Sequence, residues 1–246
     1  GLEDAYEPGR SMGTFGEDCA AKYGFTRAEQ DAFATASVER AKAATASGAF
    51  AAEITPVTVK SRAGETVVSV DEGPGKVKLD KIASLKPAFK KDGTITAASS
   101  SSINDGAAAL VMMRASTATK LGCKPLARIV GHATHAQEPE WFATAPLGAT
   151  QKALAKAGWA VGDVDLWEIN EAFAVVPMAL MKELNLPHDK VNVNGGACAL
   201  GHPIGASGAR IMVTLIYALQ ARGLKKGLAT LCIGGGEATA VAVELV

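Results

Sequence analysis

The sequence has no surplus of charge of either sign and no long apolar run. Its 25 lysine and arginine residues are balanced by 25 aspartate and glutamate residues, and neither sign clusters into a run that could neutralise a phosphate backbone. We therefore expect no nucleic-acid partner. No stretch approaches the ~18 uninterrupted apolar residues of a membrane-spanning helix, so we expect no membrane partner. With 48% hydrophobic and 20% charged residues, the 246-residue chain is too apolar to be disordered.

Cysteine is scarce. The chain has four, with no C-x-x-C pair and no cysteine and histidine spacing that suits tetrahedral zinc: Cys19, Cys123, Cys198 and Cys232. This pattern predicts free thiols, no metal site and a reducing compartment such as the cytoplasm. The chain opens at Gly1 without an initiator methionine, a basic leader or an apolar signal region. We therefore expect the native start, with any organellar targeting segment, to lie upstream.

Helical and strand-like patterns alternate over the second half of the chain. Capping residues, apolar runs and terminal glycines predict helices over residues 26–47, 116–121, 145–157, 172–184 and 204–222. Strands are predicted over residues 54–60, 66–70, 94–97, 107–113, 126–130, 164–169, 191–193, 228–233 and 238–246. This alternation indicates an α/β protein with a layered sheet covered by helices. The last two strands follow each other without a helix, so part of the sheet should be antiparallel.

Asn170 comes directly after a predicted buried strand, where open α/β sheets gather their ligands. An asparagine at this place can cap the following helix by accepting from its free amides. It can also position a substrate oxygen or a water. The residues themselves leave both interpretations open.

His202 lies in a run of glycines and other small residues that spans residues 195–210. Such a run packs a core poorly and costs backbone entropy, which indicates that something must approach the backbone closely. Pro203 suits the first turn of the following helix and fixes the loop that presents the imidazole. A phosphate-binding loop is a weaker interpretation, because the run matches neither common nucleotide-binding glycine motif.

Cys232 ends another predicted buried strand and is followed by Gly234, Gly235 and Gly236. A buried cysteine is usually a small hydrophobic residue, and we interpret the other three cysteines in that way. The glycines beside Cys232 favour a functional role, because they leave amides unhindered by side chains, as an oxyanion hole requires.

These three segments, in this order, resemble the motifs of the thiolase family. They read N-E-A-F-A at residues 170–174, G-G-A-C-A-L-G-H-P-I-G-A-S-G-A-R at residues 195–210 and C-I-G-G-G at residues 232–236. The resemblance continues upstream at residues 11–13, 29–31, 85–89 and 104–109, and so covers almost the whole chain.

The resemblance implies a thiolase-like layered fold with a mixed five-stranded sheet covered by helices, plus an α+β loop domain. Residues 1–100 would form the loop domain, with coenzyme A binding and oligomer contacts. Residues 101–122 would be a remnant of the N-terminal core domain, and residues 123–246 the C-terminal core domain. The family's nucleophilic cysteine lies in the N-terminal core domain, and none of the four cysteines here matches it. We therefore expect the missing N-terminal thiolase segment to be a partner of this chain.

The activity implied is that of an acetyl-CoA C-acetyltransferase, which condenses two acetyl-CoA molecules or cleaves acetoacetyl-CoA. His202 would activate the absent thiol, and Cys232 would act as the second acid or base. Asn170 would fix a water in one oxyanion hole, and Gly234 would contribute its amide to the other. No resident cofactor is expected, since coenzyme A and acyl-CoA thioesters are the substrates.

The resemblance also indicates substrate-binding residues and an assembly. Ser101 resembles the serine that contacts the pantetheine arm, and we expect Met12, Ala172 and Phe173 to line the substrate or coenzyme A site. The family forms homodimers and homotetramers. Two departures concern acyl preference: no histidine precedes Met12, and Ser99–Ser102 replaces a more usual N-A-S-G run.

Three alternatives remain. A broader 3-ketoacyl-CoA thiolase of fatty-acid β-oxidation would share all the motifs. A non-catalytic acyl-CoA-binding fragment would explain the absent nucleophile. A ketoacyl synthase is disfavoured, because that relative uses a second histidine where this chain has Cys232.

Overall fold

The computed structural model describes residues 2–246. Its strands are β1 (Val57–Ser61), β2 (Gly64–Val68), β3 (Ala127–Ala136), β4 (Leu166–Ile169), β5 (Lys226–Ile233) and β6 (Glu237–Leu245). Its α-helices are α1 (Met12–Tyr23), α2 (Arg27–Ser47), α3 (Gly73–Lys76), α4 (Ala115–Leu121), α5 (Ala145–Ala157), α6 (Val175–Leu184), α7 (Ala197–Leu200) and α8 (Ser207–Arg222). Short 3-10 helices are η1 (Leu79–Ser84), η2 (Pro139–Thr144), η3 (Val161–Asp163) and η4 (His188–Lys190).

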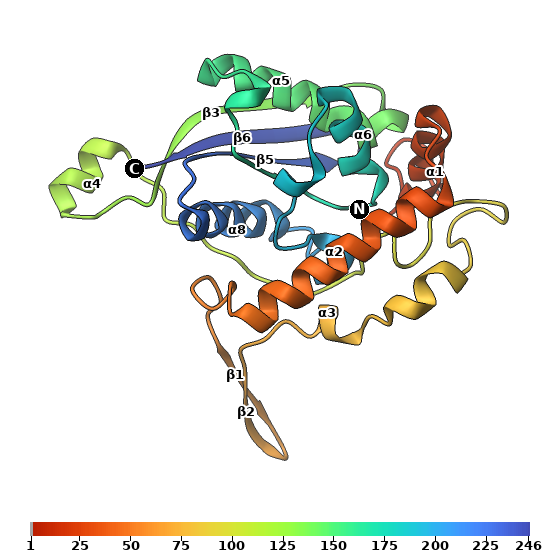
Figure 1. Cartoon of the computed structure of the whole chain (residues 1–246), viewed down its shortest axis with the longest axis horizontal. Coiled ribbons are helices and arrows are strands. Elements are labelled where there is room, and N and C mark those ends of the chain that lie inside the picture. The colour runs from red at the N-terminus through yellow and green to blue at the C-terminus, as the bar shows by residue number, and fades with distance from the viewer. Residues whose placement is uncertain (1) are drawn as a thin grey trace.

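A mixed sheet organises the C-terminal half. Its strand order is β3-β6-β5-β4, with β4 parallel to β5 and the other neighbours antiparallel. Helix α5 packs on one face of this sheet and α8 on the other (Figure 1). The layered α/β arrangement with a partly antiparallel sheet is therefore confirmed.

The sheet has four strands in the described part of the chain, and the expected fifth strand at residues 191–193 is wrong. Val191 makes only an isolated parallel bridge to Trp167. The next residue, Asn192, has a left-handed backbone with φ of +48°, which ends any extended run. The side chain of Asn192 then pairs with the backbone of Ile169 in place of a continuing strand.

The N-terminal 100 residues contribute the helices α1 and α2, the short helices α3 and η1, and a hairpin. Helix α2 begins with the predicted capping box: Thr26 Oγ1 accepts from the Glu29 amide at 3.2 Å, and the Glu29 carboxylate accepts from the Thr26 amide at 2.7 Å. At its middle, α2 packs closely on the loop before α7, where a Cβ on Gly195 would lie 2.5 Å from the Ser37 carbonyl oxygen. The β1–β2 hairpin extends away from the rest of the molecule (Figure 1).

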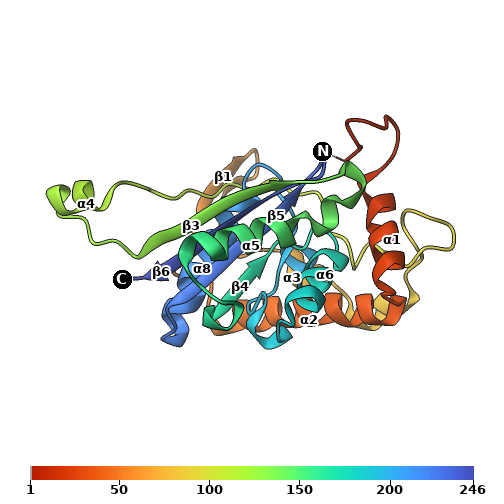
Figure 2. The same cartoon turned by 90° about the horizontal axis from the view of Figure 1, so that it is seen from above.

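Residues 101–114 run between the two halves without helix or strand, so the buried strand predicted at 107–113 is wrong. Val111 is 86% exposed and Met112 is 71% exposed. A strand needs a neighbour for its backbone groups, and none lies alongside this segment within residues 2–246. The segment leads into α4, which lies away from the sheet in both views (Figures 1 and 2).

The main core lies between the sheet, α5 and the helices of the N-terminal part. Phe15 of α1 packs edge-on against Phe142, at 6.2 Å between ring centroids, and Trp167 of β4 is 1% exposed in the same cluster. A smaller cluster joins α8 to the other face of the sheet. No helix in the described part of the chain has the length and apolar character needed to cross a membrane.

Candidate functional site

Asn170 lies at the carboxyl end of the parallel strand pair. Its amide donates to the Thr230 carbonyl at 3.0 Å and continues the β4–β5 ladder by one residue. The side chain is 1% exposed, and its Oδ1 has no hydrogen-bond partner among residues 2–246. Helix α6 begins only at Val175, with Ala174 as its N-cap, so the helix-cap interpretation of Asn170 is wrong. A buried amide with a free oxygen is suited to hold a water or a substrate group.

The imidazole of His202 lies beside Asn170. Its Nε2 is 3.5 Å from Nδ2 of Asn170, and its Nδ1 is 2.6 Å from Oγ of Ser207. Burial, together with the positive charge of Arg210, lowers the pKa of His202 below its usual value. The ring is therefore neutral near pH 7 and can accept a proton.

A buried carboxylate fixes the loop that carries His202. Glu171, fully buried, accepts from Ser37 Oγ at 2.7 Å, from Asn192 Nδ2 at 2.8 Å and from the Cys198 amide at 3.0 Å. Ser37 Oγ in turn accepts from the Gly196 amide at 3.0 Å. Glu171 thus joins the strand end of Asn170 to α2 and to the glycine-rich loop.

Cys232 is the next-to-last residue of β5, near the carboxyl end of the strand beside β4. The parallel register pairs Ile169 with Thr230, so Asn170 and Cys232 follow at neighbouring strand ends. Burial raises the pKa of the Cys232 thiol to about 12. The thiol is therefore protonated near neutral pH, which suits a group that delivers a proton.

The turn after Cys232 connects β5 to β6 through residues 234–236. Gly236 has a left-handed φ of +86°, and a Cβ there would lie 2.2 Å from the Gln137 carbonyl oxygen, so only glycine fits. A Cβ on Gly234 would lie 3.6 Å from Met12 Cε. The structure thus places Met12 of α1 against the turn that contains Gly234.

Ser101 and Ala172 are in direct contact. The amide and the hydroxyl of Ser101 both donate to the Ala172 carbonyl, at 3.0 and 3.1 Å. Phe173 is 8% exposed and packs within the aromatic core. One residue after Ser101, the Ser102 carbonyl accepts from the His202 amide at 3.0 Å. The segment around Ser101 therefore contacts both the segment that follows Asn170 and the loop that carries His202.

The geometry supports proton transfer beside a group that stabilises an oxyanion. A neutral imidazole lies beside an unsatisfied buried amide, and a protonated thiol lies near the end of the neighbouring strand β5. No cluster of three histidine, cysteine or acidic side chains in residues 2–246 is suited to a metal ion.

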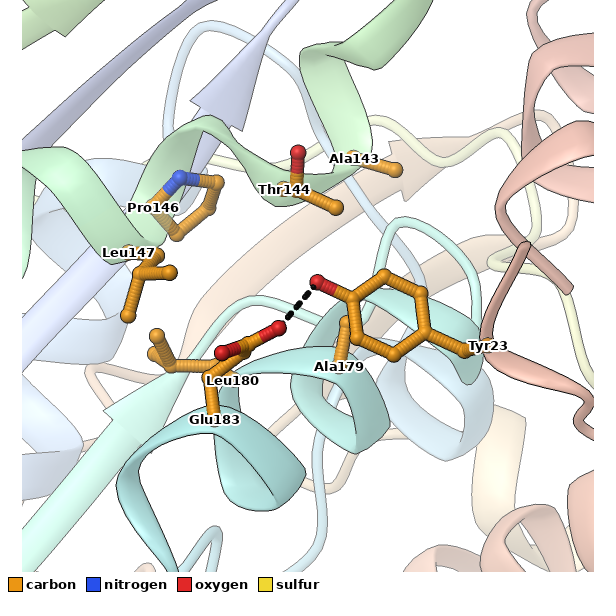
Figure 3. A pocket seen from close by; sticks show the side chains of 8 residues that line it. All are labelled: Tyr23, Ala143, Thr144, Pro146, Leu147, Ala179, Leu180 and Glu183. Carbon is orange, nitrogen blue, oxygen red and sulfur yellow. Dashed lines mark hydrogen bonds between the residues drawn. The ribbon is translucent and has the colours of Figure 1, made fainter.

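Two hollows lie on the surface, one beside the His202 loop and one away from it. An open one of about 340 Å³ adjoins the His202 loop and is lined by residues 104–108 and 203–206. The other, shown in Figure 3, is a narrow crevice beside Tyr23, whose hydroxyl donates to Glu183 at 2.8 Å. The crevice includes none of the predicted site residues.

Sequence reasoning missed the residues that hold the site in place, which are Ser207, Glu171 and Ser37. Glu171 and Ser207 lie inside the recognised motifs. A polar residue within a run of small or apolar residues could have marked each of them as a residue that supports the site. Ser37 lies 134 positions before its partner Glu171, and no local pattern marks that pairing.

Comparison with known proteins gives two matches to family models. Residues 1–116 match the model "Thiolase, N-terminal domain", and residues 123–245 match "Thiolase, C-terminal domain". Acetyl-CoA acetyltransferases of Chromobacterium violaceum and Paracoccus denitrificans are 55% and 51% identical over 99% of this chain. The chain spans 62% of the length of each of these relatives.

Solved structures give the same picture. The acetyl-CoA acetyltransferase of Bacillus anthracis superposes with a TM-score of 0.95 at 46% identity, over 100% of this chain and 62% of that chain. The human mitochondrial 3-ketoacyl-CoA thiolase superposes with a TM-score of 0.91 at 37% identity, with the same coverage.

Proposed function

Because this chain belongs to the thiolase family, we propose that the protein containing it is an acetyl-CoA C-acetyltransferase. It joins two acetyl-CoA molecules into acetoacetyl-CoA and coenzyme A, and catalyses the reverse thiolysis. The observation that carries this proposal is the 3.5 Å approach of His202 Nε2 to Asn170, at a sheet edge that also carries the protonated thiol of Cys232. The names of the relatives at 51% and 55% identity support the choice of substrate.

In the proposed mechanism, His202 takes the proton of a nucleophilic cysteine, which then accepts the acyl group as a thioester. A free thiol has a pKa near about 8.5, so a neutral imidazole beside it is needed for much thiolate at pH 7. Cys232 moves the second proton, at the α-carbon in condensation or at the leaving group in cleavage.

Two oxyanion holes complete the mechanism. Asn170 holds a water that, with His202, stabilises one negative oxygen, and the Gly234 amide contributes to the other. The free Oδ1 of Asn170 supports the first of these roles. A donor of this kind typically stabilises the transition state by roughly 3 to 4 kcal/mol.

The nucleophile is proposed to come from the rest of the full-length protein. Cys19 and Cys198 are buried, and burial raises the pKa of both thiols. Cys123 is exposed after α4, and Cys232 already has the second role. The relatives are longer than this chain, which spans 62% of their length, and this difference leaves room for a nucleophile domain.

Substrate binding is proposed at the surface formed by Ser101, Ala172 and Phe173, with Met12 beside the Gly234 turn. In this proposal residues 1–100 are the loop domain, residues 101–122 belong to the N-terminal core domain, and residues 123–246 form the C-terminal core domain. The contacts of Ser101 with Ala172 support a shared surface for the pantetheine arm.

We also propose that the protein forms a homodimer or homotetramer and acts in the cytoplasm. The β1–β2 hairpin exposes apolar side chains that a partner subunit would cover: Val57, Val59 and Val68 on one face and Val67 on the other. The four free cysteines support a reducing compartment.

A broader 3-ketoacyl-CoA thiolase is the second candidate. The human mitochondrial 3-ketoacyl-CoA thiolase shares the fold closely, and no histidine precedes Met12 in this chain. A non-catalytic acyl-CoA-binding role is the third.

Thiolysis by the full-length protein separates these candidates. We expect loss of acetoacetyl-CoA absorbance with wild type, a fall of at least ~100-fold in His202→Ala and Cys232→Ala, and little change in the control Cys123→Ala. Activity only on longer 3-ketoacyl-CoA would replace the acetyl assignment. Binding of coenzyme A without turnover of any 3-ketoacyl-CoA would contradict the enzyme proposal.

A further inference from the structure

Ser207 is the first residue of α8 and is fully buried. Its Oγ donates to the Pro203 carbonyl at 3.1 Å and lies 2.6 Å from Nδ1 of His202. A hydroxyl has a single proton. With that proton directed at Pro203, Oγ accepts at its short contact with His202, which favours a hydrogen on Nδ1.

The neighbour of the other ring nitrogen, Nε2, also favours the tautomer with hydrogen on Nδ1. Nε2 of His202 faces Nδ2 of Asn170, which is a donor, at 3.5 Å. A donor at this place is compatible with a lone pair on Nε2 and opposes an N–H there. Two independent neighbours, one on each ring nitrogen, thus favour hydrogen on Nδ1.

We propose that Ser207 is a positioning residue that holds neutral His202 as the Nδ1–H tautomer and so directs the basic Nε2 lone pair toward Asn170. The opposite tautomer would place an N–H at the site and could not take a proton from a thiol. The catalytic meaning of this inference rests on the proposed thiolase activity, whereas the tautomer itself does not.

The direct test is nitrogen spectroscopy of the full-length protein labelled with ¹⁵N-histidine. The chain has four histidines, and the His202 signals are identified by their loss in His202→Gln. We expect Nδ1 to have the shift of a protonated nitrogen and Nε2 that of an unprotonated one, at a pH above the ring's pKa. A protonated Nε2 in the wild-type protein would overturn the proposal without any substitution.

Variants of Ser207 test the link to catalysis. In Ser207→Ala we expect the two tautomers to mix and kcat to fall by about 10-fold or more while KM changes little. Ser207→Thr keeps the hydroxyl and should restore most of both properties. Thr214→Val, which removes a hydroxyl two turns further along α8, should change neither.

The outcomes remain distinguishable. An unchanged tautomer and an unchanged kcat in Ser207→Ala would contradict the proposal. A wild-type protein with the Nδ1–H tautomer but no thiolysis of any 3-ketoacyl-CoA would support the tautomer assignment and refute the proposed function.

Discussion

The side-chain amide of Asn192 pairs with both backbone groups of Ile169. Oδ1 accepts from the Ile169 amide and Nδ2 donates to the Ile169 carbonyl, each at 2.8 Å. These are the two bonds that a neighbouring strand would otherwise supply to the end of β4. The same Nδ2 also donates to Glu171, so the support of the strand end and of the His202 loop meet in one side chain.

We therefore predict that Asn192→Ala lowers the free energy of unfolding by at least ~3 kcal/mol. The substitution leaves buried groups of Ile169 and Glu171 without partners, at about 1 to 3 kcal/mol each. Asn185→Ala is the matched control, because Asn185 also has a positive φ, of +51°, as the C-cap of α6. It should cost only ~1 kcal/mol. Equal losses in denaturant unfolding would show that backbone conformation, not side-chain pairing, is what matters.

Stability should fall as the pH rises through the neutral range. Burial raises the pKa of Glu168 to about 8 and that of Glu53 to about 7, from an ordinary value of 4.5. Between the ordinary pKa of 4.5 and these raised values, the folded protein keeps protons that the unfolded chain releases. Raising the pH in this range therefore favours unfolding. Each such group contributes a slope of at most about 1.4 kcal/mol per pH unit.

The variant Glu168→Gln tests this assignment. An amide has no proton to lose, so unfolding curves between pH 5 and 8 should show a flatter decline than wild type. Exposed Glu65, on β2, provides the control as Glu65→Gln. An unchanged slope in Glu168→Gln would place the titration elsewhere.

Alkylation should separate the cysteines. With a pKa of about 12, Cys232 has only about one thiolate in ten thousand thiols at pH 8. Cys123 is exposed and should react first with iodoacetamide, as measured by peptide mass spectrometry. Rapid labelling of Cys232 at pH 8 would mean that its thiol is neither buried nor protonated as the structure indicates.

The isolated 246-residue chain should self-associate. Residues 103–113 expose large apolar side chains, including Val111 and Met112, and leave backbone groups without strand partners. The double variant Val111→Lys, Met112→Lys should lower the mass measured by light scattering, whereas Val246→Lys, at an exposed apolar residue outside this segment, should leave this association in place. A monomeric wild-type chain would contradict the prediction.

Local patterns predicted most of the elements of the fold. Helix α5 has the predicted bounds, and the Thr26 capping box is formed as expected. The parallel and antiparallel strands follow from the presence or absence of a helix between them. The motifs also placed Asn170 and His202 together: Asn170 comes directly after β4, and the glycine-rich loop brings His202 beside it.

The errors have a common physical cause. An apolar run forms a strand only if another strand lies beside it, and residues 107–113 have no such neighbour in the described chain. Asn192 ends the predicted strand at residues 191–193 because its backbone is left-handed, a conformation that the sequence alone does not show. The Glu171 and Ser37 pairing depends on how α2 packs on the glycine-rich loop, which is a tertiary contact.

The strip of Ser99–Ser102 has a consequence for synthesis on the ribosome. It is bound by the Ala172 carbonyl, by the Ala174 amide and by the His202 amide. The last of these partners follows the strip by 100 positions, which at ~5–20 residues per second corresponds to a wait of roughly 5 to 20 s. During that interval the polar strip and the apolar residues just after it emerge without their partners, so nascent chains should be clients of co-translational chaperones until the last third of the sequence is made.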